Sequence, residues 1–381
     1  MRVESYTSFD RLKAWFLRKT PLGGVRRLSA IAGAIASDIG TSREENQDRA
    51  AIMRVTDFSG ETYTLVAVSD GMGGMQSGGI CAATTLAAFF TSFMVRSREG
   101  IRFDEGIIES ALDANRAVYD LYGGRGGATL SALLINASGN CIWLNVGDSR
   151  IYGVRDSGIL QFTTDDTISG QLGDKFGGLK NRSELLQFVG MGEELEPHYS
   201  LFGFSDANHF LVTTDGVHYL DEKILQDIAL NAPDAGACLK RLVDVSKWCG
   251  GKDNCSAVMF AMSESLFFQD EFAGRGVCEV WDSFGDLQFF FEEKHFEKKY
   301  ARVGESEVKD VKEGKSKSRA KTKPKNLSVG KKALPSSWDK VLKERYVDIE
   351  ADADYRESKN NPEKNIEKTP PQLKISFPGK D

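Results

Sequence analysis

The sequence contains few histidines, cysteines and prolines, and it has no strong excess of either charge. Its 381 residues include 4 His, 6 Cys and 9 Pro, and the formal net charge is -6. No two cysteines form a CxxC pair, so we expect neither a zinc site nor a disulfide framework; scattered cysteines are typical of a reduced, intracellular protein. The mild charge gives no support for nucleic-acid binding.

Long apolar runs are also missing. No stretch has the length of a membrane span, so no transmembrane segment is expected. Residues 1–27 are basic but lack the apolar core and cleavage site of a signal peptide. We expect a flexible or loosely docked leader there and not a membrane-surface helix, although Leu12, Trp15 and Phe16 could form one apolar face. These absences favour a cytoplasmic protein.

The composition that remains is that of a globular chain, with 41% hydrophobic and 27% charged residues. Short apolar runs in hairpins predict strands, and longer amphipathic or apolar segments predict a few helices. The expected strands are 29–36, 50–54, 65–69, 128–135, 141–146, 151–154, 209–214 and 256–262, and the expected helices are 80–94, 104–122, 221–230 and 234–249. This pattern favours an α+β fold with mainly antiparallel sheet.

Composition divides the chain into segments. We expect a globular domain over 28–265, with an irregular, mobile and partly helical excursion at 165–208. An extra β-hairpin follows within 266–297. The charged segment 298–381 has little to bury and is expected to be mostly disordered, with a short helix near 337–347. That helix could be a docking peptide or could pack on its own domain.

One stretch points to chemistry. The apolar run 65–69 ends in Asp70, and three glycines follow within four positions, Gly71, Gly73 and Gly74. The run predicts a buried strand, and the glycines allow a sharp turn close to whatever Asp70 holds. A carboxylate at the end of a buried strand is costly unless a positive charge meets it, and a hard cation supplies that charge.

Three further aspartates share this context: Asp148, Asp215 and Asp253 each lie beside a predicted strand. A single Asp-Gly pair after a strand is usually only a turn. Four aspartates alternating with core strands favour a metal site lined by carboxylates, because sheets bring strand ends together. All-oxygen ligands select Mg²⁺ or Mn²⁺, and two such ions roughly 3.5–4 Å apart activate a water for attack on phosphorus.

Five segments, in order, resemble the motifs of the metal-dependent serine/threonine protein phosphatases of type 2C (the PPM family), particularly the bacterial ones. They are Arg43-Glu44-Glu45-Asn46-Gln47-Asp48, Asp70-Gly71-Met72-Gly73-Gly74, Asn145-Val146-Gly147-Asp148-Ser149-Arg150, Thr214-Asp215-Gly216-Val217 and Asp253-Asn254. The resemblance covers residues 28–262 and makes 28–265 the catalytic domain. It implies a sandwich of two antiparallel β-sheets flanked by helices, with metals in a cleft at one edge.

The resemblance also implies a metal-ligand set. Asp70 would bridge two Mn²⁺ or Mg²⁺ ions, and the Gly71 carbonyl would bind one of them. Asp215 and Asp253 would bind the other. Asp148, together with Asp215, would contribute to a third, weaker site.

Two more residues receive roles in the same way. Arg43 would bind the substrate phosphate through its planar guanidinium. Asp48 would hold metal-bound waters or act as an occasional metal ligand. The implied activity is hydrolysis of phosphoserine or phosphothreonine in proteins by a metal-bridging water, opposing a Ser/Thr kinase. The implied catalytic residues are Arg43, Asp48 and Asp70.

The chain departs from the family pattern in two places. Met72 and Met75 occupy positions where relatives often carry a histidine, and 165–169 replaces an Asp-His-Ser motif. Proton delivery to the leaving group would then fall to a metal-bound water. The alternative hypothesis is a pseudophosphatase that binds phosphoproteins, or a scaffold whose tail recruits partners.

Overall fold

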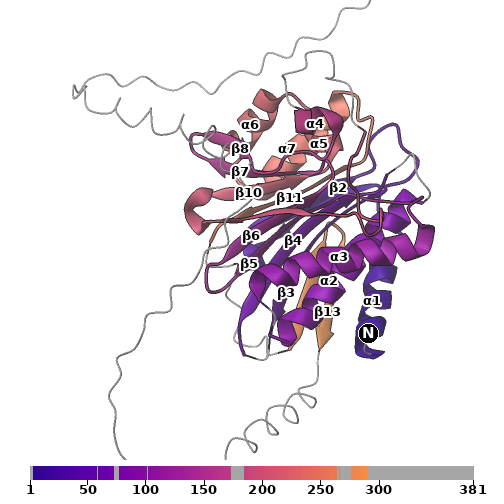
Figure 1. Cartoon of the computed structure of the whole chain (residues 1–381). Coiled ribbons are helices and arrows are strands. Elements are labelled where there is room, and N and C mark those ends of the chain that lie inside the picture. The colour runs from indigo at the N-terminus through magenta and orange to yellow at the C-terminus, as the bar shows by residue number, and fades with distance from the viewer. Residues whose placement is uncertain are drawn as a thin grey trace, which may run out of the picture. The chain divides into compact units, whose positions relative to one another are not determined.

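The computed structural model describes residues 3–57, 59–72, 77–100, 102–172, 184–263, 266 and 276–290. These residues form two antiparallel β-sheets packed face to face, with helices on both outer faces (Figure 1). The predicted α+β sandwich is confirmed. The predicted tail at 298–381 and its helix near 337–347 lie outside the described residues.

The first sheet, sheet A, has six strands in the order β1-β2-β11-β10-β7-β8. Their bounds are β1 Gly23–Leu28, β2 Gly33–Asp38, β11 Cys255–Ala261, β10 His209–Thr213, β7 Arg150–Arg155 and β8 Gly158–Gln161. Every neighbouring pair is antiparallel.

The second sheet, sheet B, has seven strands in the order β13-β12-β3-β4-β5-β6-β9. Their bounds are β13 Gly285–Phe290, β12 Val277–Asp282, β3 Asp48–Thr56, β4 Thr62–Asp70, β5 Leu130–Asn136, β6 Cys141–Val146 and β9 His198–Phe202. The predicted late hairpin is confirmed as β12–β13. Because β12 pairs with β3, the hairpin extends sheet B instead of standing apart.

Helices cover the outer face of each sheet (Figure 1). On sheet B lie α1 Val3–Phe16, α2 Gly78–Arg98 and α3 Phe103–Tyr122, and on sheet A lie α5 Asp215–His218, α6 Glu222–Asn231 and α7 Ala235–Trp248. The short helix α4 is Ile168–Leu172, and 3-10 turns occupy Ser29–Ile31 and Phe204–Asp206.

The strand β4 shows why the apolar runs are continuous instead of alternating. Leu65 and Ala67 face the helices on sheet B, whereas Val66 and Val68 face the space between the sheets. All four side chains are fully buried. Because both faces of the strand are covered, apolar residues are favoured at consecutive positions over 65–68.

Helix α2 differs from the sequence-based expectation that no membrane-length segment exists. By length and composition it could cross a membrane, and it is the one such helix in the described part of the chain. In the fold, however, 83% of its most apolar window is buried. Its phenylalanines pack between sheet B and the neighbouring helices, so the core accounts for its apolar composition.

The expectation of a flexible leader at 1–27 is wrong for the described residues. Residues 3–16 form α1, whose Leu12 and Phe16 are buried against α2, and Phe16 lies edge-to-face on Phe90. Residues 23–28 form the edge strand of sheet A. The apolar side chains are few but lie on one helix face, and burying that face outweighs the basic composition.

The irregular excursion expected at 165–208 is only partly correct. The described residues of this region include α4 and the strand β9, which pairs with β6 at the edge of sheet B. The residues of β9 are mostly exposed, as is common for a strand at the edge of a sheet.

Candidate metal and phosphate site

Five carboxylates meet where several strands end. Antiparallel pairing of β3 with β4 places Asp48 opposite Asp70. Asp148 follows β6, Asp215 begins α5 directly after β10, and Asp253 precedes β11. Burial raises the pKa of Asp70 well above its ordinary value, and the charges of the other four carboxylates raise it further. The structure therefore brings together the aspartates that the sequence singled out.

Two neighbouring carboxyls respond in the same way. Burial, followed by the charge of Asp215, raises the pKa of Asp148 to about 7. Burial also raises the pKa of Asp48 to about 7, although a hydrogen bond from Thr214 opposes the shift. The Oδ1 atoms of Asp48 and Asp215 are buried and accept no hydrogen bond. Unpartnered buried oxygens among like charges fit a bound cation.

The described carboxylates alone do not form a complete metal coordination shell. No group of three or more His, Cys, Asp or Glu side chains among the described residues is arranged as a metal site. Instead Asp253 is held by Arg43 in an ion pair. Mg²⁺ sites commonly use only one or two carboxylates and retain several waters. The donor set of oxygens therefore fits Mg²⁺ or Mn²⁺.

Two glycines let the backbone segments approach each other. A Cβ on Gly71 would lie 2.1 Å from the carbonyl oxygen of Gly78, at the start of α2. A Cβ on Gly216 would lie 1.8 Å from the carbonyl oxygen of Asn254. Any side chain at either position would push these segments apart, which explains both Asp-Gly pairs.

Arg43 lies at the exposed side of the cluster. Its Nη2 atom is 2.6 Å from Asp253 Oδ2, and 43% of its side chain is exposed. The hydrogen bond to Asp253 raises its pKa, and the charges of Asp215 and Asp70 add to this effect. A guanidinium that is both anchored and accessible beside the carboxylates is suited to bind a phosphate.

Asn254 fixes the loop that carries Arg43 and Asp48. Its Oδ1 accepts a hydrogen bond of 2.8 Å from the backbone N–H of Gln47. Its Nδ2 donates to the carbonyls of Ile39, at 2.9 Å, and Glu45, at 3.0 Å. The sequence motif contained Asn254, but its partners more than 200 positions away could not be identified from the motif alone.

Thr214 has a similar role on the other side of Asp48. Its hydroxyl donates to Asp48 Oδ2 at 2.8 Å and accepts from the backbone N–H of Ser256 at 3.0 Å. Asp48 is 2% exposed, so this bond fixes a carboxylate that water does not surround. The motif signalled position 214 without indicating this contact.

The segment 165–169, where the family motif is missing, contains a different arrangement. Asp166 accepts a hydrogen bond from the Gly147 N–H at 2.9 Å, beside Asp148. The Nε2 atom of His198, from β9, lies 2.8 Å from the other oxygen of Asp166. The hydrogen bond to Asp166 raises the pKa of His198. His198 therefore supports, through Asp166, the turn before Asp148.

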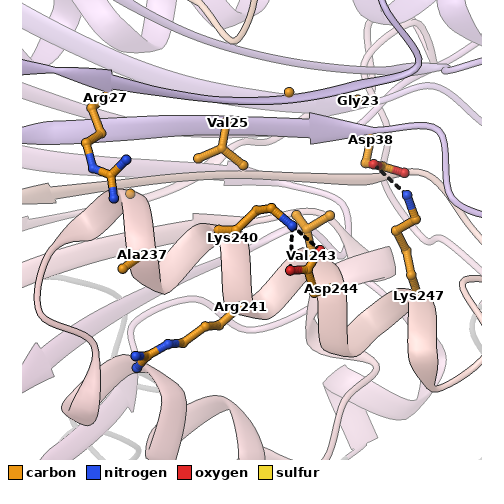
Figure 2. A pocket seen from close by; sticks show the side chains of 12 residues that line it. Gly23, Val25, Arg27, Asp38, Ala237, Lys240, Arg241, Val243, Asp244 and Lys247 are labelled. Carbon is orange, nitrogen blue, oxygen red and sulfur yellow. Dashed lines mark hydrogen bonds and ion pairs between the residues drawn. The ribbon is translucent and has the colours of Figure 1, made fainter.

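Two cavities lie near these elements. A groove of about 670 Å³ lies between β1 and α7, and none of the five carboxylates lines it (Figure 2). Four of its charged side chains form two ion pairs, Lys240 with Asp244 and Lys247 with Asp38. A second cavity, of about 310 Å³, is lined by Asp48 together with 16–22 and 282–284.

Comparison with known proteins identifies bacterial phosphatases, although no family profile matches the chain. The serine/threonine protein phosphatase PstP of Mycobacterium tuberculosis is 27% identical over 243 residues, which are 59% of this chain and 44% of PstP. The chain thus spans less than half of that relative. Protein phosphatase PhpP of Streptococcus pneumoniae is 24% identical over 247 residues, covering 61% of this chain and 97% of PhpP.

Solved structures agree. The PPM Ser-Thr phosphatase MsPP of Mycobacterium smegmatis, in complex with cacodylate, has a TM-score of 0.51 and 29% identity, covering 62% of this chain and all of MsPP. The catalytic domain of PstP in complex with two manganese ions has a TM-score of 0.50 and 24% identity, covering 63% of this chain and 98% of that domain. The chain is therefore similar in sequence and in fold to the bacterial type 2C (PPM) serine/threonine phosphatases.

Proposed function

We propose that this chain is a Mn²⁺- or Mg²⁺-dependent phosphatase that hydrolyses phosphoserine and phosphothreonine in proteins. The observation that carries the proposal is the group of five aspartates, in which the charges of the other four raise the pKa of Asp70, with an anchored arginine beside them. Such a group is costly for folding and useful for holding cations against a phosphate. The similarity to PstP and PhpP, both protein phosphatases, supports the same activity.

Each residue has a role in this proposal. Asp70 and the Gly71 carbonyl would hold one cation, Asp70 with Asp215 and Asp253 a second, and Asp148 with Asp215 a weaker third. When bound, such cations lower the pKa of water and neutralise charge on a phosphate ester. The two manganese ions in the PstP domain support a two-ion site.

The protein side chains do the positioning. Arg43 binds two oxygens of the phosphate, because its planar guanidinium matches their geometry. Asp48, held by Thr214 through a 2.8 Å hydrogen bond, orients water at the inner side of the cluster. No histidine occupies the positions of Met72 and Met75, so the leaving alkoxide takes its proton from water.

The remaining parts of the proposal concern context. We place the catalytic domain at 28–265, in the cytoplasm, where it opposes a Ser/Thr kinase. The segment 298–381 would bind a docking partner. The support is the charged, weakly apolar composition of that segment and the kind of substrate named for the relatives.

The test is hydrolysis of p-nitrophenyl phosphate and of a phosphothreonine peptide, with Mn²⁺ and with EDTA. Wild-type protein is compared with Asp215→Ala and with a matched control, Asp120→Ala, an exposed aspartate on α3. We expect turnover that requires the metal, disappears in Asp215→Ala and persists in the control. Folded, Mn²⁺-bound protein without turnover would instead support the phosphoprotein-binding pseudophosphatase.

A further inference from the structure

Arg49 connects the proposed site to two elements outside the motif segments. The residue follows Asp48 on β3, and its side chain is half-buried. Its Nη1 donates to the carbonyls of Asn46, at 2.8 Å, and Asp48, at 2.6 Å. Its Nε donates to the carbonyl of Phe16, at 2.6 Å. One guanidinium thus joins the loop that carries Arg43 and Asp48 to the end of α1.

The contact at Phe16 has a clear physical cause. Phe16 is the last residue of α1, and the final carbonyls of a helix lack partners within it. They also form the negative end of the helix dipole, which favours a cation. Because Arg49 is always charged and carries several donors in one plane, it can satisfy helix and loop together.

The end of α1 is in turn fixed by the late hairpin. Arg18 makes two hydrogen bonds to the carboxylate of Asp282, at 2.7 and 2.8 Å, and its guanidinium lies 3.5 Å from the centre of the Trp15 ring. Asp282 also accepts the N–H groups of Phe284 and Gly285, which shape the turn between β12 and β13. Figure 1 shows α1 beside this hairpin.

These contacts form a continuous path from the turn between β12 and β13 to the motif loop, that is, residues 43–48. It runs from Asp282 through Arg18 to the end of α1, and from there through Arg49 to the backbone of Asp48. The motif segments span 43–254, so both α1 and the hairpin lie outside them. MsPP is covered completely by 62% of this chain, so the chain has additional segments beyond that shared domain.

We propose that Arg49 is a positioning residue that makes the placement of Asp48 depend on α1 and the β12–β13 hairpin. The hairpin and α1 thereby become part of the catalytic unit and not merely added stability. Loss of Arg49 would leave the core intact but would loosen residues 44–48. The inference deepens the proposed function, since Asp48 belongs to that site.

The first measurement is amide hydrogen exchange in the full-length, metal-free protein, which requires neither activity nor Mn²⁺. We compare Arg49→Met with Arg54→Met as the matched control. Arg54 lies on the same strand and pairs with Glu279 of the same hairpin at 2.8 Å, but at the end far from the motif loop. We expect faster exchange at 44–48 in Arg49→Met than in wild-type protein, and wild-type exchange there in Arg54→Met.

A milder variant guards against misfolding. In Asp282→Asn the side-chain oxygen can still accept the turn N–H groups, but the charge that holds Arg18 is lost. We expect a smaller increase of exchange at 44–48, with the exchange of α2 and α3 unchanged. Wild-type exchange at 44–48 in both Arg49→Met and Asp282→Asn would overturn the inference.

The second measurement is Mn²⁺ binding by calorimetry, together with kcat and KM. Partners behind metal-binding residues typically change affinity or activity by about 10- to 100-fold. We expect a fall in this range in Mn²⁺ affinity or kcat for Arg49→Met, with KM little changed. If wild-type protein neither binds Mn²⁺ nor turns over substrate, the proposed function fails, and the exchange data still decide the role of Arg49.

Discussion

The proposed site and the groove between β1 and α7 differ in whether their carboxylates have partners. In the groove each carboxylate meets a cation, as in the 3.0 Å pair of Lys247 with Asp38 (Figure 2). In the site the buried Oδ1 atoms of Asp48 and Asp215 have no partner. Folding alone would pair charges or expose them, so an unpaired buried group indicates a ligand that completes it.

The largest expected effect comes from removing the central charge of the site. Asp70→Asn should lower hydrolysis on the order of 1,000-fold, as for other preorganised electrostatic groups. The same change removes repulsion among five carboxylates, so the Tm of the metal-free protein should rise, by about 3 °C for each 1 kcal/mol gained. Steady-state kinetics and thermal unfolding in EDTA test the two parts.

The direction of the change in Tm distinguishes the site from the groove. Asp38→Asn in the groove removes a carboxylate that has partners, namely Lys247 and the N–H of Gly40. That variant should therefore lower the Tm. If Asp70→Asn also lowered the Tm in EDTA, the carboxylates would not be in the unfavourable state that we describe.

The second effect concerns the scaffold of the site. Asn254→Ala removes three hydrogen bonds and leaves part-buried backbone groups of the 39–47 loop without these partners. We expect a loss of about 3 kcal/mol in the free energy of unfolding. Urea denaturation measures it, with Asn231→Ala, at the exposed end of α6, as the control. A loss equal to that of the control would show that the loop is fixed by other contacts.

The difference between local patterns and long-range contacts explains how much of the fold and of the site could be predicted from the sequence. The apolar run before Asp70 and the Asp-Gly turns are local patterns, so most of the central strands were predicted correctly. The aspartates that the sequence singled out lie close together, and their roles as metal ligands stay a prediction. The contacts of Asn254 and Arg49 join segments that are distant in sequence, and no local pattern encodes them. The helix at 3–16 was missed for the same reason, because its apolar partner, α2, lies about 75 residues further along the chain.

The third effect depends on pH. The pKa of Asp48 and Asp148 rises from 3.8 to about 7. Between these values the folded, metal-free protein binds more protons than the unfolded chain, so its free energy of unfolding falls as pH rises. Mn²⁺ competes with those protons, and at 100 times its Kd it adds about 2.7 kcal/mol. The gain in Tm from Mn²⁺ should therefore be larger at pH 8 than at pH 5.

Thermal unfolding with EDTA and with Mn²⁺ across this range tests the third prediction. The metal-free curve should fall from pH 4 to pH 7 and then level off, whereas the curve with Mn²⁺ should fall less. Asp215→Ala serves as the control, since without that ligand the two curves should nearly coincide. Equal gains from Mn²⁺ at pH 5 and pH 8 would contradict the assignment of the raised pKa values to the metal site.

The smallest effect is expected in the groove, where the charges already have partners. Lys240 and Asp244 form an exposed pair one helical turn apart on α7. Such pairs contribute about 0.3–0.5 kcal/mol, and screening by salt reduces this further. Lys240→Ala should thus lower the free energy of unfolding by no more than this amount and leave kcat unchanged. A gain in stability for Lys240→Ala would mean that the groove, like the site, holds unfavourable charge, and the contrast between the two regions would then be lost.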